Sequence, residues 1–285
     1  MTNSRVYISI IIIGYNTKRS LNLLLDSINS LIVINEKIEV IYIDDGSDDG
    51  SLQLFQNAQI KFPKQHFGFK KNKGRVSARQ QGVKLSNGEW LLFLNSNVIV
   101  QNTLIQNYLK GIQITDGLAF AGNRKYDKSN DLILEKYLNH KKRGINRFSH
   151  YVPISYKYLL FDNCLINNHV FDFIKLDSSL KHYGGEELDF AYKMNKKFLN
   201  KIVACRSACV IRLAYPKFKD HCMRLIEFGE TNFIRLPFTL QKNIIRNKKF
   251  LNRKSFILKK LIDIIYAVSI TSYKTNIPYL NYYII

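Results

Sequence analysis

The sequence predicts an α/β fold with a mostly parallel central sheet flanked by helices. Three apolar runs, at residues 6–13, 38–43 and 89–94, lack the polar alternation of a half-exposed strand, so each indicates a strand buried on both faces. Segments with helical spacing separate these runs, and the order strand, helix, strand, helix, helix, strand is typical of a parallel, helix-covered sheet. The carboxyl ends of such strands meet at one edge, where α/β sheets bind ligands.

The helices of the first hundred residues are expected between these strands. Residues 20–31 predict an amphipathic helix, because their leucine and isoleucine residues recur three or four positions apart. A short helix is predicted over residues 51–57, and residues 64–73 are expected to form a basic loop. Residues 75–86 again show the spacing of a helix.

The second half of the chain has a weaker pattern. Residues 123–152 are polar, basic and poorly periodic, so we expect a long excursion near the site. The other elements expected are a helix at residues 103–114, strands at 118–121, 158–161 and within 202–213, and helices at 186–198 and 219–233.

The last part of the chain, residues 240–285, combines lysine and arginine with isoleucine and leucine and ends in aromatic residues. This pattern predicts a basic amphipathic helix. Such a helix can lie on an acidic membrane surface, with its cations toward the headgroups. It can equally pack its apolar face on the protein's own domain, and the sequence leaves both arrangements open.

The formal net charge of +21 is concentrated in residues 61–84, 136–147 and 242–260. A surplus of this size predicts anionic partners such as nucleotide phosphates or acidic headgroups, or it reflects a solvated surface. Nucleic acid is not expected as a partner, because the sequence has no zinc-finger spacing, no RNP-like aromatic string and no distinct helix-turn-helix.

The four cysteines indicate reduced thiols in a cytoplasmic protein, because they show no paired CxxC spacing and no secretory leader precedes them. No stretch reaches about 18 uninterrupted apolar residues, so a membrane-spanning helix is not expected. We therefore expect a cytoplasmic protein, either free or peripheral at the inner face of the membrane.

Two carboxylates and a glycine follow the second apolar run directly. Asp44 can accept hydrogen bonds from a base or a ribose, and Gly46 allows the backbone to pass close to a ligand. The alternative is a solvated turn in which Ser47 caps the next helix.

Several segments together resemble family 2 glycosyltransferases with the GT-A fold. The segments are IIIIGYN at residues 10–16, IDDGSDDGS at 43–51, the run at 72–82 and FLNSN at 93–97. A further block, YGGEELDF at residues 183–190, is similar to the GGED-type motif of the galactosyltransferase-like and chondroitin-polymerase-like branches.

This resemblance implies a GT-A domain over residues 1–235, followed by the basic tail at 236–285. Residues 1–100 would bind the nucleotide sugar, and residues 101–235 would bind the acceptor. The expected reaction is inverting transfer of a sugar from a nucleotide-sugar donor to a glycan or lipid-linked acceptor, and the expected donor is a UDP-sugar.

The resemblance also implies the donor-binding residues. A guanidinium suits a pyrophosphate, and Arg75 and Arg79 are four positions apart on one helical face; a solvated face is the alternative. The full expected donor set is Gly14, Tyr15, Asn16, Asp44, Asp45, Gly46, Lys73, Arg75, Arg79, Asn95 and Asn97.

Glu187 stands where the family places its catalytic carboxylate. Inverting transfer needs a base to remove the proton of the attacking hydroxyl, and a carboxylate meets that need. Glu186 and Arg212 are expected with it in the catalytic set, and Glu186, Gly185 and Asp189 are expected to bind the acceptor. The alternative is that these acidic residues only complement the dipole of the helix that begins here.

Two positions depart from the family pattern. Asn95-Ser96-Asn97 replaces the usual Asp-x-Asp, and an amide oxygen is a far weaker ligand for Mg²⁺ or Mn²⁺ than a carboxylate. Arg212 stands where the GGED-type branch has a histidine ligand. We therefore expect no metal, and Arg212, Arg79 and Lys73 would supply the positive charge. The alternative is a degenerate member of the fold that only binds a nucleotide or a partner.

Overall fold

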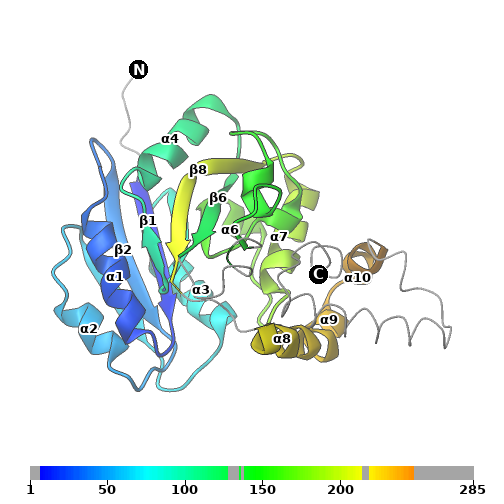
Figure 1. Cartoon of the computed structure of the whole chain (residues 1–285), viewed down its shortest axis with the longest axis horizontal. Coiled ribbons are helices and arrows are strands. Elements are labelled where there is room, and N and C mark those ends of the chain that lie inside the picture. The colour runs from blue at the N-terminus through cyan, green and yellow to red at the C-terminus, as the bar shows by residue number, and fades with distance from the viewer. Residues whose placement is uncertain (1–6, 128–134, 136–137, 214–217, 247–285) are drawn as a thin grey trace.

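The computed structural model describes residues 7–127, 135, 138–213 and 218–246 (Figure 1). Its strands form one eight-stranded sheet in the order β3-β2-β1-β4-β7-β6-β8-β5. The strands are β1 (Tyr7–Gly14), β2 (Lys37–Asp44), β3 (Lys64–Gly68), β4 (Trp90–Asn95), β5 (Val98–Val100), β6 (Ala119–Tyr126), β7 (Asn163–Asn167) and β8 (Ile202–Arg212).

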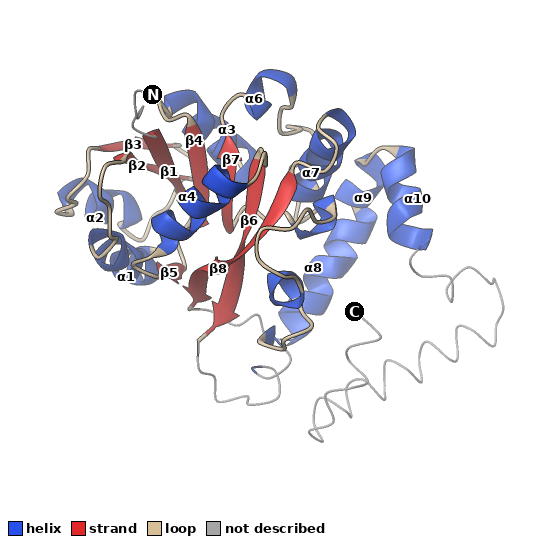
Figure 2. Cartoon of the chain, turned by 90° about the horizontal axis from the view of Figure 1, so that it is seen from above, coloured by secondary structure: helices blue, strands red, loops and turns tan. Residues whose placement is uncertain are grey.

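Helices cover both faces of this sheet. The helices are α1 (Lys18–Asn29), α2 (Ser51–Asn57), α3 (Arg75–Leu85), α4 (Leu104–Ile114), α6 (Val170–Phe173), α7 (Glu186–Lys197), α8 (Phe218–Glu230), α9 (Asn232–Arg235) and α10 (Phe238–Arg246). Helices α1, α2 and α4 pack on one face, and α3, α6 and α7 pack on the other (Figure 2). The predicted α/β fold is confirmed.

The first half of the sheet is parallel. β1 pairs in parallel with β2 and with β4, and β2 pairs in parallel with β3. In this register Gly14 lies opposite Asp44, and Ile13 lies opposite Asn95. The carboxyl ends of β1, β2 and β4 therefore meet at one edge, as the three apolar runs predict.

The second half of the sheet is mixed. β7 runs antiparallel to both β4 and β6, β5 runs antiparallel to β8, and β6 and β8 are parallel to each other. A register irregularity lies between Gly122 and Asn123 of β6, across from β8. This half brings the start of β5 next to the ends of β6 and β8.

The structure departs from the expected elements at several segments. Residues 64–73, expected as a loop, contain the edge strand β3. An edge strand tolerates polar side chains such as those of Lys64, Gln65 and His66, so its sequence lacks the apolar pattern of a strand. Residues 123–126 continue β6, and the three-residue β5 was not expected. Residues 158–161, expected as a strand, form none: Leu159 and Phe161 pack in the core, and the strand follows at β7.

Helices α8 to α10 lie together at one end of the sheet (Figure 1). Leu236 and Leu240 are buried there against Leu180 and Tyr192. Residues 236–246 of the expected tail thus pack on the domain, and residues 247–285 lie outside the described residues. Within the ranges that the structure describes, no helix is long and apolar enough to cross a membrane.

Candidate active site

Asp44 lies at the end of β2, next to the last residue of β1. Its Oδ1 accepts a hydrogen bond from the hydroxyl of Tyr42 (3.2 Å), and its Oδ2 accepts one from the N–H of Ser47 (2.8 Å). The carboxylate is buried, so it does not belong to a solvated turn. A β-carbon at Gly14 would lie 2.6 Å from the Tyr42 hydroxyl, which explains the glycine beside this group.

Asn16 connects the loops that follow β1 and β2. Its backbone adopts a left-handed conformation with φ 52°. Its N–H donates to Ser47 Oγ (2.9 Å), and its side-chain Oδ1 accepts from the N–H of Asp48 (3.0 Å). Ser47 therefore binds the neighbouring loop and does not cap α2. The exposed ring of Tyr15 lies beside this connection.

Asp45 fixes the loop that leads into α3. Its carboxylate accepts hydrogen bonds from the N–H groups of Lys73 (2.7 Å) and Gly74 (3.0 Å). Burial raises the pKa of Asp45 above its ordinary value, although both backbone donors favour the charged form. Gly46, with φ 81°, allows the two loops to touch, because a β-carbon there would lie 2.5 Å from the carbonyl carbon of Lys71.

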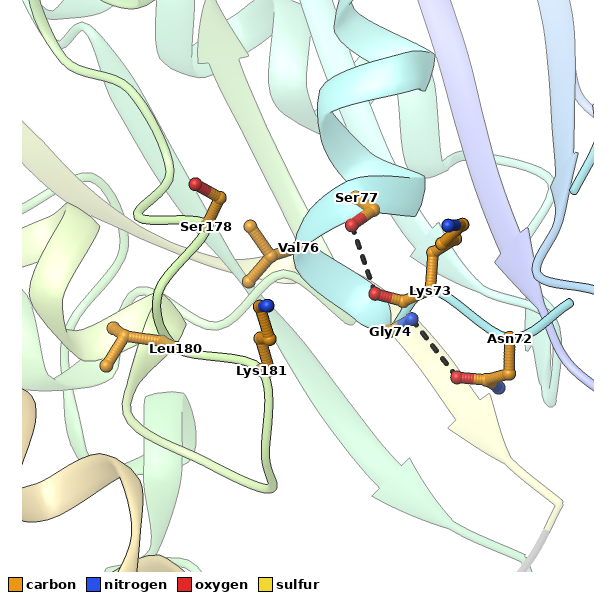
Figure 3. Close-up of a pocket in the computed structure, with 8 residues that line it drawn as sticks. All are labelled: Asn72, Lys73, Gly74, Val76, Ser77, Ser178, Leu180 and Lys181. Carbon is orange, nitrogen blue, oxygen red and sulfur yellow. Dashed lines mark hydrogen bonds between the residues drawn. The ribbon is translucent and has the colours of Figure 1, made fainter.

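A cavity of about 450 Å³ lies beside this loop, at the first turn of α3. Figure 3 shows Asn72 and Lys73 on one side of that turn and the segment containing Ser178 and Lys181 on the other. Its lining residues are Asn72, Lys73, Gly74, Val76, Ser77, Ser178, Leu180 and Lys181. The cavity thus adjoins the expected donor edge through Lys73, and neither glutamate of α7 lines it.

Helix α7 begins with Glu186 and Glu187 after two glycines in the left-handed region. Gly184 has φ 82° and Gly185 has φ 89°. A β-carbon at Gly185 would also lie 2.8 Å from the ring of Phe228. Only glycine satisfies both conditions, and the resulting turn directs the two glutamates toward α3.

Arg79 on α3 contacts both glutamates. Its Nη1 lies 3.1 Å from Glu186 Oε1, and its Nη2 lies 2.5 Å from Glu187 Oε1. Burial lowers the pKa of Arg79, but the charges of Glu187 and Glu186 outweigh burial and hold it above its ordinary value. The side chain is only 1% exposed and lies over the ring of Phe161. We expected Arg79 beside the donor phosphates, and the structure instead buries it between two carboxylates.

The two glutamates differ in access to solvent. The side chain of Glu186 is 2% exposed and also pairs with Arg75 Nη2 (2.9 Å), whereas the side chain of Glu187 is 17% exposed. Of this pair, therefore, Glu187 has the accessible carboxylate. Glu186, which we expected to contact the acceptor, is enclosed by two guanidinium groups in this structure.

Asp189, also expected to bind the acceptor, lies apart from this pair. Its Oδ2 accepts from Lys193 Nζ (2.6 Å), and the residue is buried. Burial raises the pKa of Asp189 above its ordinary value. These contacts give Asp189 a partner within α7 itself and do not connect it to Glu187.

Asn97 and Arg212 are far apart in the sequence and adjacent in the fold. Arg212 pairs with Val98 across β5 and β8, and the N–H of Leu213 donates to the carbonyl of Asn97 (3.0 Å). Both Asn97 Oδ1 and Arg212 Nε are buried and have no hydrogen-bond partner within the described residues. Asn95 ends the neighbouring strand β4.

The sequence reasoning missed a second charged group, Arg124 and Asp162. Arg124 Nη1 forms an ion pair with Asp162 Oδ2. The guanidinium carbon of Arg124 lies 5.5 Å from the ring centre of Tyr126, and that of Arg212 lies 5.9 Å from the same ring. No local sequence pattern predicts that these side chains lie together, because Arg124 and Tyr126 belong to β6, Arg212 to β8 and Asp162 to the segment before β7.

The residues at this edge do not fit a divalent metal. Positions 95 and 97 carry amides, and position 212 carries a cation that repels one. Across the described ranges, no group of three or more His, Cys, Asp or Glu side chains is placed to hold a metal ion. The residues present at this edge therefore lack the carboxylate pair that would hold a dication.

Comparison with known proteins identifies a family for this chain. The family model described as "Glycosyl transferase family 2" matches residues 9–175. The uncharacterized glycosyltransferase YfnE of Bacillus subtilis is 27% identical over 165 residues, which are 56% of this chain and 40% of YfnE. The chain thus spans less than half the length of that relative.

Two solved structures share the fold at low sequence identity. Mannosyltransferase PcManGT from Pyrobaculum calidifontis, solved with GDP-Man and Mn²⁺, has a TM-score of 0.65 at 14% identity and covers 99% of this chain and 86% of its own. S. aureus TarS 1–349 has a TM-score of 0.58 at 16% identity, over 93% of this chain and 79% of its own. Because the family model covers more than half of the sequence, the chain belongs to glycosyl transferase family 2.

Proposed function

We propose that this protein transfers a sugar, with inversion, from a nucleotide-sugar donor to a glycan or lipid-linked acceptor. UDP-sugars are the first donors to test. The observation that carries the proposal is the carboxylate of Glu187, which is held by Arg79 at 2.5 Å and is accessible where its neighbour Glu186 is not. It belongs to the same domain as the loops joined at Gly14, Asn16 and Asp44.

In this proposal the donor nucleoside lies at the joined ends of β1 and β2. Each carboxylate oxygen has two lone pairs, so Asp44 can accept a hydrogen bond from a base or ribose besides those from Tyr42 and Ser47. Asp45 and Gly46 hold the loop that carries Lys73, whose exposed side chain can approach the donor phosphates.

Glu187 is the proposed general base. As the acceptor oxygen attacks the anomeric carbon, the bond from that carbon to the diphosphate oxygen breaks, and the proton of the acceptor hydroxyl passes to Glu187. Arg79 contacts Oε1 of Glu187, so Oε2 is left for the acceptor. Arg79 and Arg75 then act as positioning residues, since both hold the buried Glu186 that precedes the base.

Arg212 is proposed to stabilise the departing diphosphate without a metal. Two carboxylates and a dication sum to a charge of zero, whereas two amides and one guanidinium sum to plus one. The leaving group would therefore still meet positive charge. The unpartnered Arg212 Nε supports this role, because its N–H is a donor that a phosphate oxygen would satisfy, whereas the unpartnered Asn97 Oδ1 is an acceptor that needs a donor such as a sugar hydroxyl.

The nature of the acceptor would determine where the protein lies in the cell. A lipid-linked acceptor would bring it to the inner face of a membrane as a peripheral protein. The net charge of +21 supports this, because anionic headgroups attract basic surfaces.

One observation favours a second function. Asn95 and Asn97 replace the usual carboxylates, as would be expected in a binding protein that retained the donor edge and lost transfer. Such a protein would be stabilised by nucleotides in a thermal-shift panel. It would release no nucleoside diphosphate from any sugar donor, with or without an acceptor.

The test is a release assay over a panel of UDP- and GDP-sugars with glycan and lipid-linked acceptors. We expect wild-type turnover with one donor and a loss of about 10²- to 10⁴-fold in Glu187→Gln, with donor binding retained. Glu89→Gln is the matched control, because Glu89 is exposed at the opposite ends of the strands. Equal turnover in Glu187→Gln and wild type would refute the assignment of the base.

A further inference from the structure

Arg124 and Asp162 form a charged pair beside the proposed site that the reaction above does not use. Arg124 lies near the end of β6, and Asp162 immediately precedes β7. Their side chains are 24% and 9% exposed. Asp162 is therefore largely enclosed, whereas part of Arg124 remains accessible.

The strand register places Arg124 on the same face of the sheet as Arg212. In the parallel pair of β6 and β8, Tyr126 lies opposite Arg212, and Arg124 lies opposite Val210. Residues two apart on a strand point to the same face. The ring of Tyr126 confirms this, because it lies within 6 Å of both guanidinium groups.

Arg124 also lies within electrostatic reach of the proposed base. Burial lowers the pKa of Arg124, but the negative charges of Asp162 and, more weakly, Glu187 outweigh burial and raise it above its ordinary value. A guanidinium stays protonated in proteins, so Arg124 is a permanent cation. Its guanidinium shares the ring of Tyr126 with that of Arg212, which places it beside the proposed leaving-group site.

We propose that Arg124 is a second diphosphate-binding residue that acts together with Arg212. The inference rests on the proposed function and extends it. When the bond from the anomeric carbon to oxygen breaks, the electron pair stays on the diphosphate, and two guanidinium groups would receive that charge where a dication serves in other enzymes. Asp162 contacts Nη1, and a guanidinium has five N–H donors, so others can bind phosphate oxygens.

The competing explanation is that Arg124 only neutralises the enclosed Asp162. The single variant Arg124→Gln cannot separate the two, because it leaves Asp162 without its cation. The double variant Arg124→Gln/Asp162→Asn removes both charges and restores a neutral pair. It therefore recovers stability under either explanation, and its affinity for a diphosphate decides between them.

The experiment compares the dissociation constants of UDP with uridine, and of GDP with guanosine, by calorimetry. We expect both Arg124→Gln and the double variant to bind the preferred diphosphate about 10- to 100-fold more weakly than wild type, with nucleoside affinity unchanged. Arg147→Gln is the matched control, because Arg147 also lies over tyrosine and phenylalanine rings in this half of the chain.

Wild-type affinity for the diphosphate in the double variant would overturn the inference. So would a wild-type protein that binds the diphosphate no more tightly than the nucleoside. The comparison requires no turnover, so it is distinguishable from a failure of the proposed function, which would appear as absence of transfer by the wild type.

Discussion

Replacement of Arg79 by methionine tests how strongly the buried guanidinium holds the two glutamates. Glu186 would retain Arg75 at 2.9 Å, but Glu187 would lose the only ion-pair partner that it has among the described residues. Removing one partner of a buried ion pair costs about 3–5 kcal/mol. At about 2–4 °C per kcal/mol for a domain of this size, the melting temperature should fall by about 6–20 °C.

Thermal unfolding followed by circular dichroism measures this change. Arg19→Met is the matched control, because Arg19 is an exposed residue on helix α1, and it should shift the melting temperature by less than about 2 °C. A triple variant that adds Glu186→Gln and Glu187→Gln to Arg79→Met should recover much of the loss, since no buried charge is left unpaired. A melting temperature for Arg79→Met equal to that of the control would refute this reasoning.

Two further predictions concern the scaffold. The carboxylate of Glu39 accepts hydrogen bonds from Ser9 and Asn87. Burial raises the pKa of Glu39, but these hydrogen bonds outweigh burial and hold the folded pKa below its ordinary value. The ionised Glu39 therefore stabilises the fold, and this contribution to stability is lost as the pH falls through the folded pKa. The difference in melting temperature between wild type and Glu39→Gln should therefore shrink between about pH 5 and pH 3, and a constant difference would contradict the assignment. Gly46→Ala should lower stability and weaken UDP or GDP binding more than Gly144→Ala. Both glycines have positive φ, but only at Gly46 would an added β-carbon clash with neighbouring backbone. Equal effects of the two variants in calorimetry would contradict this prediction.

The sequence predicted the parallel half of the fold because its strands are buried on both faces. β1, β2 and β4 are short and mostly apolar, with Ser9 and Glu39 as interior exceptions, and a short apolar run of this kind is typical of a buried strand. The sequence did not predict β3, because an edge strand can be polar, or β5, because three residues are too few to show a periodic pattern. The mixed half depends on antiparallel returns that only tertiary packing decides.

The position of a candidate site residue was predictable where the residue belongs to a local motif. Asp44 ends an apolar run and Glu187 lies two positions after a pair of glycines, so the sequence places the first at the end of a strand and the second in the first turn of a helix. The partners of Arg79 could not be, because its ion pairs join residues more than a hundred positions apart. Arg124 lay in a segment without periodicity, and only the β6–β8 register brings it near Arg212.

The most direct test of the account measures nucleoside diphosphate release by the wild-type protein before and after EDTA, with its preferred donor and acceptor. If Arg212 and its neighbours receive the diphosphate in place of an ion, the rate should stay within about twofold. A complete loss of turnover that Mg²⁺ or Mn²⁺ restores would contradict the account.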